Sequence, residues 1–387
     1  MRSLELFTGA GGLALGTHAA GFKHVALLDW NRDACTTLRE NIRHETVPGV
    51  SEWKVVEGDV RGCDYGPFGP LQLVAGGPPC QPFSLGGKHR GVNDGRDMIP
   101  EFIRAIREIR PAAFLFENVK GLTRRAFKNY LSYIELGLQH PEVPLRSRDT
   151  WVDHLARLED VHTRGTREGL HYRIVRRLLN AADYGVPQTR ERVFIVGFRQ
   201  DLDTEWHFPE PTHSRDGLRY DQWVSGEYWE ARGLEQPEPP ARLKGAINRS
   251  LTLYPSPQKP WKTLRDAIWD LPSPRPCGEE PDALFHRLQP GARAYPGHTG
   301  SPLDLPAKTL KAGVHGVPGG ENMIAFSDGT VRYLTVREAA RVQTFPDGWR
   351  FTGSWTETMR QLGNAVPMEL AVALAESIAA TLTPQHA

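Results

Sequence analysis

The chain has 387 residues, of which 39% are hydrophobic and 24% charged, and its formal net charge is +1. These values are ordinary for a globular protein of two or three domains, or of one large domain with an insertion. The near-zero net charge neither requires nor excludes a nucleic-acid partner, because a basic cleft can lie opposite an acidic surface.

The cysteine content argues against a disulfide scaffold and against a structural metal. The four cysteines show neither C-x-x-C pairs nor a histidine spacing typical of zinc: Cys35, Cys63, Cys80 and Cys277. We therefore expect a reducing compartment and no metal. No signal peptide and no run of about 18 apolar residues is visible, so we expect no membrane span.

The first 198 residues alternate short apolar runs with helix-like segments. The expected strands are Ser3–Phe7, Val25–Leu28, Val55–Val56, Leu71–Ala75, Ala113–Phe116 and Val193–Phe198. The expected helices are Ala34–Asn41, Ile99–Ile109 and Tyr172–Asn180. This alternation predicts an α/β fold with a Rossmann-like, mostly parallel sheet that is covered on both faces.

The rest of the chain changes character twice. A charged segment at 148–169 reads as an insertion, helical or partly ordered. From about 200 to 320 Pro and Trp are frequent and the alternation fades, which predicts loops and short strands with the Trp side chains mostly in the core. Helical periodicity returns at Thr335–Gln343 and Met368–Leu382. We predict a large domain of residues 1–200 plus 354–387 and a smaller one of residues 201–353.

A glycine-rich turn follows the first strand at Thr8–Gly12, where glycines permit a tight turn and close approach of a ligand. The second strand ends at Asp29-Trp30, where a carboxylate can bind ribose hydroxyls and an indole can stack on adenine. Asp59, after the third strand, suits an adenine amino group. A nicotinamide enzyme shares these features, so they leave the cofactor open.

The next motif narrows the chemistry. Gly76-Gly77-Pro78-Pro79 after the fourth strand forms a rigid loop that directs the thiol of Cys80 away from the sheet edge. A thiolate is a strong nucleophile, and the alternative of a buried structural cysteine does not suit such a turn. A zinc deaminase would need a second cysteine where Phe83 stands.

At this point the sequence resembles the cytosine-5 DNA methyltransferases, and six blocks occur in the order of that family. They are Phe7–Gly12, Pro78–Gln81, Phe116–Val119, Gln188–Val193, Leu334–Gln343 and Gln361–Pro367. The resemblance implies S-adenosylmethionine as the cofactor and S-adenosylhomocysteine as its product. The implied cofactor contacts are Phe7, Thr8, Gly9, Gly11, Gly12, Leu13, Asp29, Trp30, Asp59, Val60, Pro79, Ile99, Asn364 and Ala365. The family more often has Glu at the position of Asp29, so we expect the shorter carboxylate to shift the ribose contact without changing the assignment, because Trp30 is present.

The same resemblance implies the catalytic roles. Cys80 adds to carbon 6 of cytosine and makes carbon 5 nucleophilic, while Glu117, kept at least partly protonated by burial, assists at N3. Arg192 contacts the cytosine O2. Arg190, two residues earlier in the same strand, helps to hold the site.

The implied substrate is a cytosine flipped out of double-stranded DNA. The loop from Leu85 to Arg96 resembles the lid that closes on DNA in this family, and Thr309-Leu310 resembles the element that ends its recognition region. The expected DNA contacts are Gln81, Ser84, Lys88, Arg90, Arg96, Asn118, Lys308, Thr309 and Lys311. We expect a monomeric bacterial or phage enzyme of restriction–modification systems, cytoplasmic, without metal or membrane. A cognate restriction endonuclease would be its companion.

Two alternatives stay open at this stage. A tRNA methyltransferase of the same family shares the core but usually lacks so large a recognition region. A non-enzymatic DNA-binding homologue would be expected to have lost the nucleophile or the acid, and Cys80, Glu117 and Arg192 are all present.

Overall fold

The computed structural model describes residues 1–79, 97–165, 169–245, 247, 258–276, 278–279, 282–312 and 320–383. The chain divides into two compact units. Unit 1 comprises residues 1–179, 191–209 and 348–387, and unit 2 comprises residues 180–190 and 210–347.

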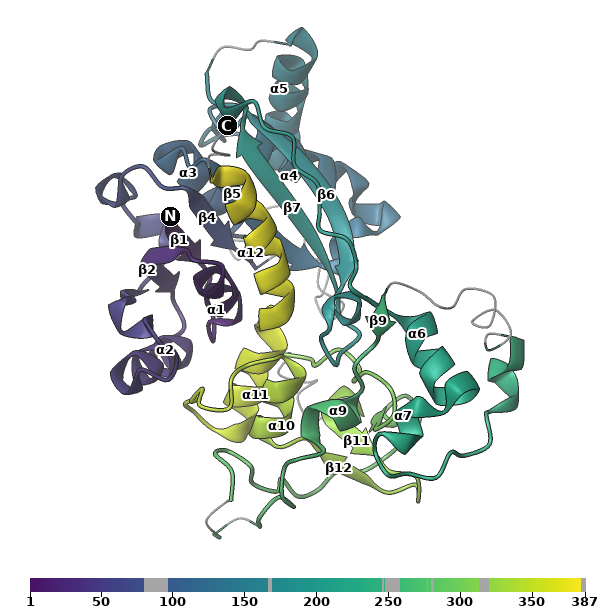
Figure 1. Ribbon diagram of the computed structural model, residues 1–387. Coiled ribbons are helices and arrows are strands. Elements are labelled where there is room, and N and C mark those ends of the chain that lie inside the picture. Colours follow the sequence, from purple (N-terminus) through teal and green to yellow (C-terminus); the bar gives the residue numbers. More distant parts are fainter. Residues whose placement is uncertain are drawn as a thin grey trace. The chain divides into compact units, whose positions relative to one another are not determined.

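A seven-stranded sheet forms the centre of unit 1, with the strand order β3-β2-β1-β4-β5-β7-β6 (Figure 1). The strands are β1 (Arg2–Leu6), β2 (Lys23–Asp29), β3 (Val55–Glu57), β4 (Leu73–Gly76), β5 (Ala113–Val119), β6 (Tyr172–Asn180) and β7 (Glu191–Arg199). The first five are parallel, and β7 runs antiparallel to β5. The predicted α/β class with a mostly parallel sheet is confirmed. Because parallel strands end at one edge, the loops after β1 to β5 gather there.

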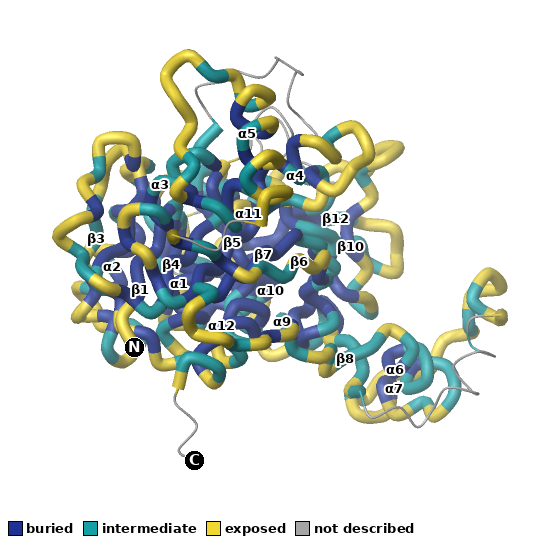
Figure 2. Tube along the Cα trace, turned by 90° about the horizontal axis from the view of Figure 1, so that it is seen from above, coloured by how far each residue is buried: buried dark blue, intermediate teal, exposed yellow. Residues whose placement is uncertain are grey.

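Helices cover both faces of this sheet (Figure 1). They are α1 (Gly12–Ala19), α2 (Arg32–His44), α3 (Ile99–Ile109), α4 (Lys128–Gln139), α5 (Trp151–Arg164), α11 (Trp355–Asn364) and α12 (Met368–Leu382). Alternate side chains of the strands, such as Leu4 and Leu6, share one hydrophobic core with α3 and α4. The central strands β1, β4, β5 and β7 are mostly dark blue, and so buried, in Figure 2, whereas the edge strands β3 and β6 are mostly intermediate or exposed. Because strand side chains alternate, Glu5 points to the opposite face.

The prediction of a helix at Tyr172–Asn180 is wrong, because this segment is strand β6 at the edge of the sheet. Its apolar residues lie three to four positions apart and imitate a helical face, but pairing with β7 overrides local preference. The charged insertion does contain a helix, α5. Thr150 and Asp153 form a capping box at its first turn.

The C-terminal segment, residues 348–387, belongs to unit 1. The indole N–H of Trp349 donates to the Ala10 carbonyl at 3.2 Å, and α12 packs against α1. The stretch Trp355–Leu382 is long and apolar enough to cross a membrane by length and composition alone, yet half of its most apolar window is buried in the protein. The buried face of α12, with Leu370, Leu374 and Ile378, is what a core helix shows.

Unit 2 consists of short elements joined by loops, in keeping with the change in composition. They are β8 (His213–Ser214), α6 (Arg215–Tyr220), α7 (Glu227–Glu230), β9 (Lys259–Pro260), α9 (Leu264–Ile268), β10 (Ser301–Pro302), β11 (Met323–Ala325), β12 (Val331–Tyr333) and α10 (Val336–Val342). Trp229 is buried with Leu218 and Tyr228, as expected of core tryptophans. Trp269 departs from that expectation, because it is 75% exposed.

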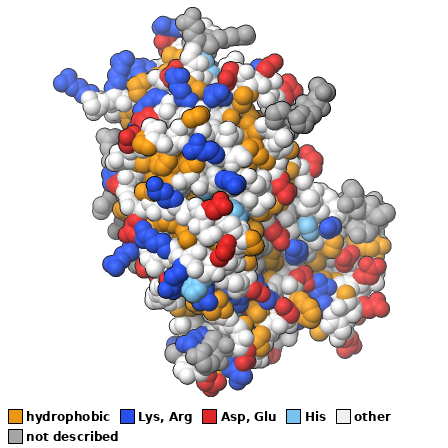
Figure 3. Space-filling view, turned by 60° about the vertical axis from the view of Figure 1, so that its left-hand side comes forward, with side chains coloured by type: hydrophobic (Ala, Val, Ile, Leu, Met, Phe, Trp, Pro, Cys, Tyr) orange, Lys and Arg blue, Asp and Glu red, His pale blue; other side chains and the backbone are white. Residues whose placement is uncertain are grey.

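Charged side chains of both signs lie among one another on the face drawn in Figure 3. This mixture agrees with a formal net charge of +1.

Candidate active site

The loop after β1 is built for close approach of a ligand. Gly9 and Gly11 have φ values of 57° and 92°, a region that favours glycine, and α1 begins directly after them. Phe7 adopts a φ of 59° despite its side chain, a strained conformation typical of functional sites. Thr8 is buried, and its backbone N–H donates to the Leu28 carbonyl at 3.2 Å. The turn is therefore fixed against the end of β2.

Asp29 and Trp30 follow β2 at the same edge. The Asp29 carboxylate accepts from the backbone N–H groups of Gly9 at 2.7 Å and Asn31 at 2.8 Å, so it ties the two loops together. Burial raises the pKa of Asp29, and these N–H groups partly offset the effect. Trp30 is 76% exposed. An exposed indole beside a held carboxylate offers a stacking surface for a flat ring.

The remaining predicted cofactor residues of unit 1 lie on loops and helix ends. Asp59 is ion-paired with Arg61, which lowers the pKa of the Asp59 carboxyl, and Val60 behind it is buried. Ile99 begins α3 and is buried. Asn364 ends α11 with an exposed side chain, and Ala365 is its C-cap. These positions agree with a shared binding edge, but the contacts themselves stay predictions.

Glu5 is a residue that the sequence analysis missed. It is 1% exposed, and neither carboxylate oxygen has a hydrogen-bond partner. Burial raises the pKa of Glu5 well above its usual range, and the nearby backbone N–H of Ala14 lowers it only in part. The available signal was an acidic residue inside an apolar strand, directly before the glycine loop. A cationic group of a bound cofactor would fit such a carboxyl.

The loop after β4 carries the predicted nucleophile. Cys80 lies outside the described residues, as do Gln81, Ser84, Lys88, Arg90 and Arg96. The described residues on either side are held firmly. Pro78 accepts from the side-chain amide of Asn118 at 3.1 Å, and Pro79 accepts from the backbone N–H of Met98 at 3.4 Å. The contact of Asn118 with DNA stays a prediction.

Glu117 lies near the end of β5 and faces this loop. Its Oε1 is 3.1 Å from Nε of Arg192 on β7, and only 11% of the Glu117 side chain and 13% of the Arg192 side chain are exposed. A Cβ placed on Gly77 would lie 2.7 Å from Oε2 of Glu117, so glycine is required for the carboxylate to lie there. Burial lowers the pKa of Arg192, and Glu117 opposes this shift.

This pairing bears on the expectation that burial keeps Glu117 protonated. A guanidinium at 3.1 Å favours a carboxylate. The ion pair thus opposes the effect of burial, and the protonation of Glu117 at the substrate ring stays a prediction.

Four predicted residues belong to unit 2. Arg190 is 1% exposed and donates from Nη1 to the Leu310 carbonyl at 3.1 Å. The Thr309 hydroxyl donates to the Thr189 carbonyl at 2.7 Å, and Lys308 reaches Thr299 at 3.0 Å. Lys311 pairs with Glu321 at 2.6 Å. Their contacts with DNA, and the catalytic role of Arg190, stay predictions.

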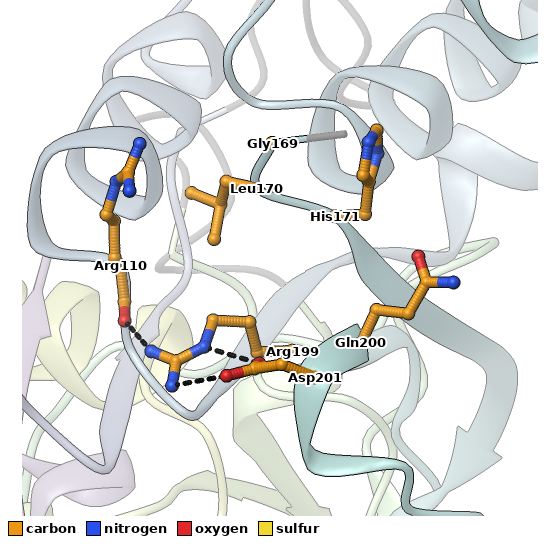
Figure 4. Close-up of a pocket in the computed structure, with 7 residues that line it drawn as sticks. All are labelled: Arg110, Gly169, Leu170, His171, Arg199, Gln200 and Asp201. Atoms are coloured by element: carbon orange, nitrogen blue, oxygen red, sulfur yellow. Dashed lines mark hydrogen bonds and ion pairs between the residues drawn. The ribbon is translucent and has the colours of Figure 1, made fainter. Parts of the chain in front are cut away.

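A hollow of about 440 Å³ lies at the edge of the sheet in unit 1 that is opposite the predicted site residues. Figure 4 shows it between Arg110 before β5 and His171 before β6, with Arg199 donating to Asp201 and to the Arg110 carbonyl. Arg110 itself pairs with Glu142. Both guanidinium groups are thus matched by carboxylates. Among the described residues, no group of three His, Cys, Asp or Glu side chains could hold a metal ion.

Comparison with known proteins agrees with this geometry. A family model described as C-5 cytosine-specific DNA methylase matches residues 1–139 and 165–380. Type II methyltransferase M.NgoMIV of Neisseria gonorrhoeae is 31% identical, over 99% of each chain. Type II methyltransferase M.PspPI of a Psychrobacter species is 33% identical, over 97% of this chain and 78% of the relative.

Solved structures share the fold. A protein of an E. coli prophage, described as a DNA modification methyltransferase, superposes with a TM-score of 0.58 at 20% identity, covering 99% of each chain. A mutant of Spodoptera frugiperda DNMT2 has a TM-score of 0.58 at 17% identity, covering 97% of this chain and 99% of the other.

The seven-stranded sheet, with the predicted site residues at the edge where its parallel strands end, defines a Rossmann-like methyltransferase fold. The chain belongs to the C-5 cytosine-specific DNA methylase family, and it is of the kind found in Type II systems. The match skips residues 140–164, the part that contains α5.

Proposed function

We propose that this protein transfers a methyl group from S-adenosylmethionine to carbon 5 of a flipped-out cytosine in a specific duplex DNA sequence. The observation that carries the proposal is the Glu117–Arg192 pair, which lies against Gly77 on the loop that leads to Cys80. A nucleophile, a carboxyl and a guanidinium are the groups that this chemistry requires.

The edge of unit 1 fits the cofactor. Trp30 offers an exposed ring for adenine, Asp29 a carboxylate for ribose, and Glu5 a buried carboxyl without a protein partner for a cationic group. When bound, S-adenosylmethionine supplies an activated methyl group on a sulfonium. The chain's own part is to place the cytosine and to raise the nucleophilicity of its carbon 5.

Each residue has one task in this scheme. The Cys80 thiolate forms a bond to carbon 6, and the displaced electron pair makes carbon 5 nucleophilic. Glu117 offers a proton or hydrogen bond at N3, where negative charge develops. Arg192 donates to O2 and, through its ion pair, holds the Glu117 carboxyl in place. After methyl transfer, a water molecule takes up the carbon 5 proton, and the electron pair of that C–H bond re-forms the double bond between carbon 5 and carbon 6 as the Cys80 thiolate leaves.

The segment 201–353 reads the target sequence in this proposal, with residues 1–200 plus 354–387 performing catalysis. The loops of unit 2 and the Thr309-Leu310 element support that division. Exchanging residues 201–325 for those of a relative should move methylation to the relative's site. Persistence of the original site would refute the division. Arg is the commonest reader of guanine, so a short GC-rich site is expected.

We infer that the enzyme works in the bacterial cytoplasm as a monomer, beside a restriction endonuclease of the same system. The Type II names of its relatives support the link to a restriction–modification system. Bisulfite sequencing of DNA from expressing cells tests the function directly, with cellular tRNA as the parallel substrate. Cytosines that resist bisulfite conversion at one DNA motif are expected. Protection confined to tRNA would favour the tRNA branch of the family.

A further inference from the structure

Within unit 2, the segment Pro187–Arg190 runs alongside the segment Ala307–Leu310. The Ala307 N–H donates to the Pro187 carbonyl at 2.9 Å, and the Thr189 N–H donates back to the Ala307 carbonyl at 2.9 Å. Gln188 and Ala307 form an isolated parallel bridge. The Ala307–Leu310 segment belongs to no regular strand, so these bonds fix an irregular stretch of chain.

Gln188 extends this ladder with its side chain, which is fully buried. Its Oε1 accepts from the Leu310 N–H at 3.0 Å, and its Nε2 donates to Oε1 of Gln343 at 2.9 Å. One amide therefore ties Leu310 to the residue that caps α10 (Val336–Val342). A buried N–H that loses its acceptor is costly, so Leu310 depends on this contact.

Arg190 holds the other side of the same residue. Its guanidinium donates to the Leu310 carbonyl at 3.1 Å, and both side chains are 1% exposed. The neighbouring residue Thr309 donates from its hydroxyl to the Thr189 carbonyl at 2.7 Å, so it is also tied to the segment that carries Gln188 and Arg190. Burying a guanidinium carries a large desolvation penalty. Placing one against the backbone of a loop indicates that the position of this loop matters.

We propose that Gln188 and Arg190 are positioning residues that set Thr309 and Leu310 for discrimination of the target sequence. The proposal rests on the proposed function, in which residues 201–353 read DNA. We call the contacts of Gln188 and Arg190 with Thr309 and Leu310 the clamp. Because the clamp holds the backbone of these two residues, its loss should lower discrimination between DNA sequences more than it slows methyl transfer on saturating DNA.

The test uses the full-length protein and the duplex site found by bisulfite sequencing, with a second duplex changed at one base pair. Gln188→Leu removes the acceptor for Leu310 in a similar volume. Gln188→Glu keeps that acceptor but loses the N–H groups that Gln188 donates to the Val342 carbonyl at 3.4 Å and to Oε1 of Gln343 at 2.9 Å. The readouts are the ratio of kcat/KM for the two duplexes, KM for DNA, and the single-turnover rate at saturating DNA.

We expect Gln188→Leu to raise KM for DNA and to lower the discrimination ratio by at least about 10-fold, with the single-turnover rate within about 3-fold. Gln188→Glu should retain more of the ratio than Gln188→Leu, because it keeps the acceptor for the Leu310 N–H. An unchanged ratio in Gln188→Leu, or a fall in the single-turnover rate alone, would overturn the proposal.

A second pair of variants covers the case in which Gln188→Leu does not fold. Thr309→Val removes only the hydroxyl, and Thr309→Ser retains it. The ratio should fall in Thr309→Val and recover in Thr309→Ser, and full discrimination in Thr309→Val would overturn the proposal. If the unaltered protein methylates no DNA, the proposed function itself fails. If it methylates DNA and the variants still discriminate fully, only the clamp fails.

Discussion

Nε of Arg192 lies 3.1 Å from Oε1 of Glu117, and nearly all of both side chains is buried. The two residues lie on the neighbouring antiparallel strands β5 and β7. Arg192 is paired in register with Val119, two residues after Glu117, which brings the two side chains together. Asn118, next to Glu117, holds Pro78 two residues before Cys80. One short stretch of β5 thus orients an acid, a cation and the loop of the nucleophile.

Glu117→Gln should slow the chemical step and spare binding. Gln keeps the shape and can accept from Arg192, but it cannot supply a proton at N3. We expect a loss of roughly 10²–10⁴-fold, the usual range for a general acid. Single-turnover methylation from a pre-formed ternary complex separates this loss from changes in affinity. A Gln variant with an unchanged rate, or with a defect only in cofactor affinity, would remove Glu117 from the mechanism.

Gly77→Ala should impair activity while leaving the fold intact. The new Cβ would lie 2.7 Å from Oε2 of Glu117, the movable end of a side chain, so the carboxylate should shift rather than the backbone. Misplacement by about 1 Å can cost on the order of 10²-fold in rate, and we expect at least about 10-fold. Gly62→Ala is the control, because nothing lies within 4 Å of its added Cβ. Equal rates in the two variants would contradict this role of Gly77.

Trp30→Ala should weaken cofactor binding. An exposed indole that gains a stacked ring contributes about 0.5–1.5 kcal/mol, which corresponds to a Kd for S-adenosylmethionine raised by roughly 2- to 12-fold. Trp269→Ala is a matched control, since Trp269 is 75% and Trp30 76% exposed. Isothermal titration calorimetry measures both. A larger effect from Trp269 than from Trp30 would show that the ring binds elsewhere.

Most strands of the sheet could be predicted from the sequence, because they are short, buried apolar runs that end in predicted site residues. β5 and β7 were predicted within a few residues, and Met368–Leu382 matches α12 at both ends. β6 was not predicted, because an edge strand with arginines on its exposed side keeps no clean alternation. The exposure of Trp269 was missed for a similar reason, since composition does not report which side of α9 faces water.

The site could be predicted only as a set of residues, not as a set of contacts. Motif order placed Glu117 and Arg192 in one family pattern, but their ion pair depends on the register of β5 and β7. Glu5 carried no motif signal beyond its charge. The contacts of Arg190 with Leu310 and of Gln188 with Gln343 join positions more than 100 residues apart, which no local pattern reveals.

Unit 1 should lose stability in mild acid through His24. This side chain is buried with hydrogen-bond partners Ser3, Thr17 and Ala14, and burial lowers the pKa of His24 to about 4. An exposed histidine in the unfolded chain has a pKa of about 6.5. Unfolding therefore takes up a proton between these values. The stability from neutral His24 is complete above about pH 6.5 and is lost as the pH falls toward 4, by about 3 kcal/mol.

Urea unfolding at pH 7.5, 6 and 5, followed by tryptophan fluorescence, measures this loss. His24→Gln should lower the free energy of unfolding at pH 7.5 but flatten its dependence on pH. His44→Gln, a change at an exposed position of α2, should leave the pH dependence as it is. The same pH dependence in the unaltered protein and in His24→Gln would rule out His24 as the source.

The most direct measurement is covalent trapping on DNA that carries 5-fluorocytosine at the methylated position. Fluorine replaces the proton that must leave carbon 5, so the bond to the enzyme cannot break. With S-adenosylmethionine present, the protein should form a denaturant-resistant adduct that peptide mass spectrometry assigns to Cys80. Cys63→Ser should still form it, and Cys80→Ser should not. Methylation without any adduct, or an adduct on a residue other than Cys80, would contradict the account.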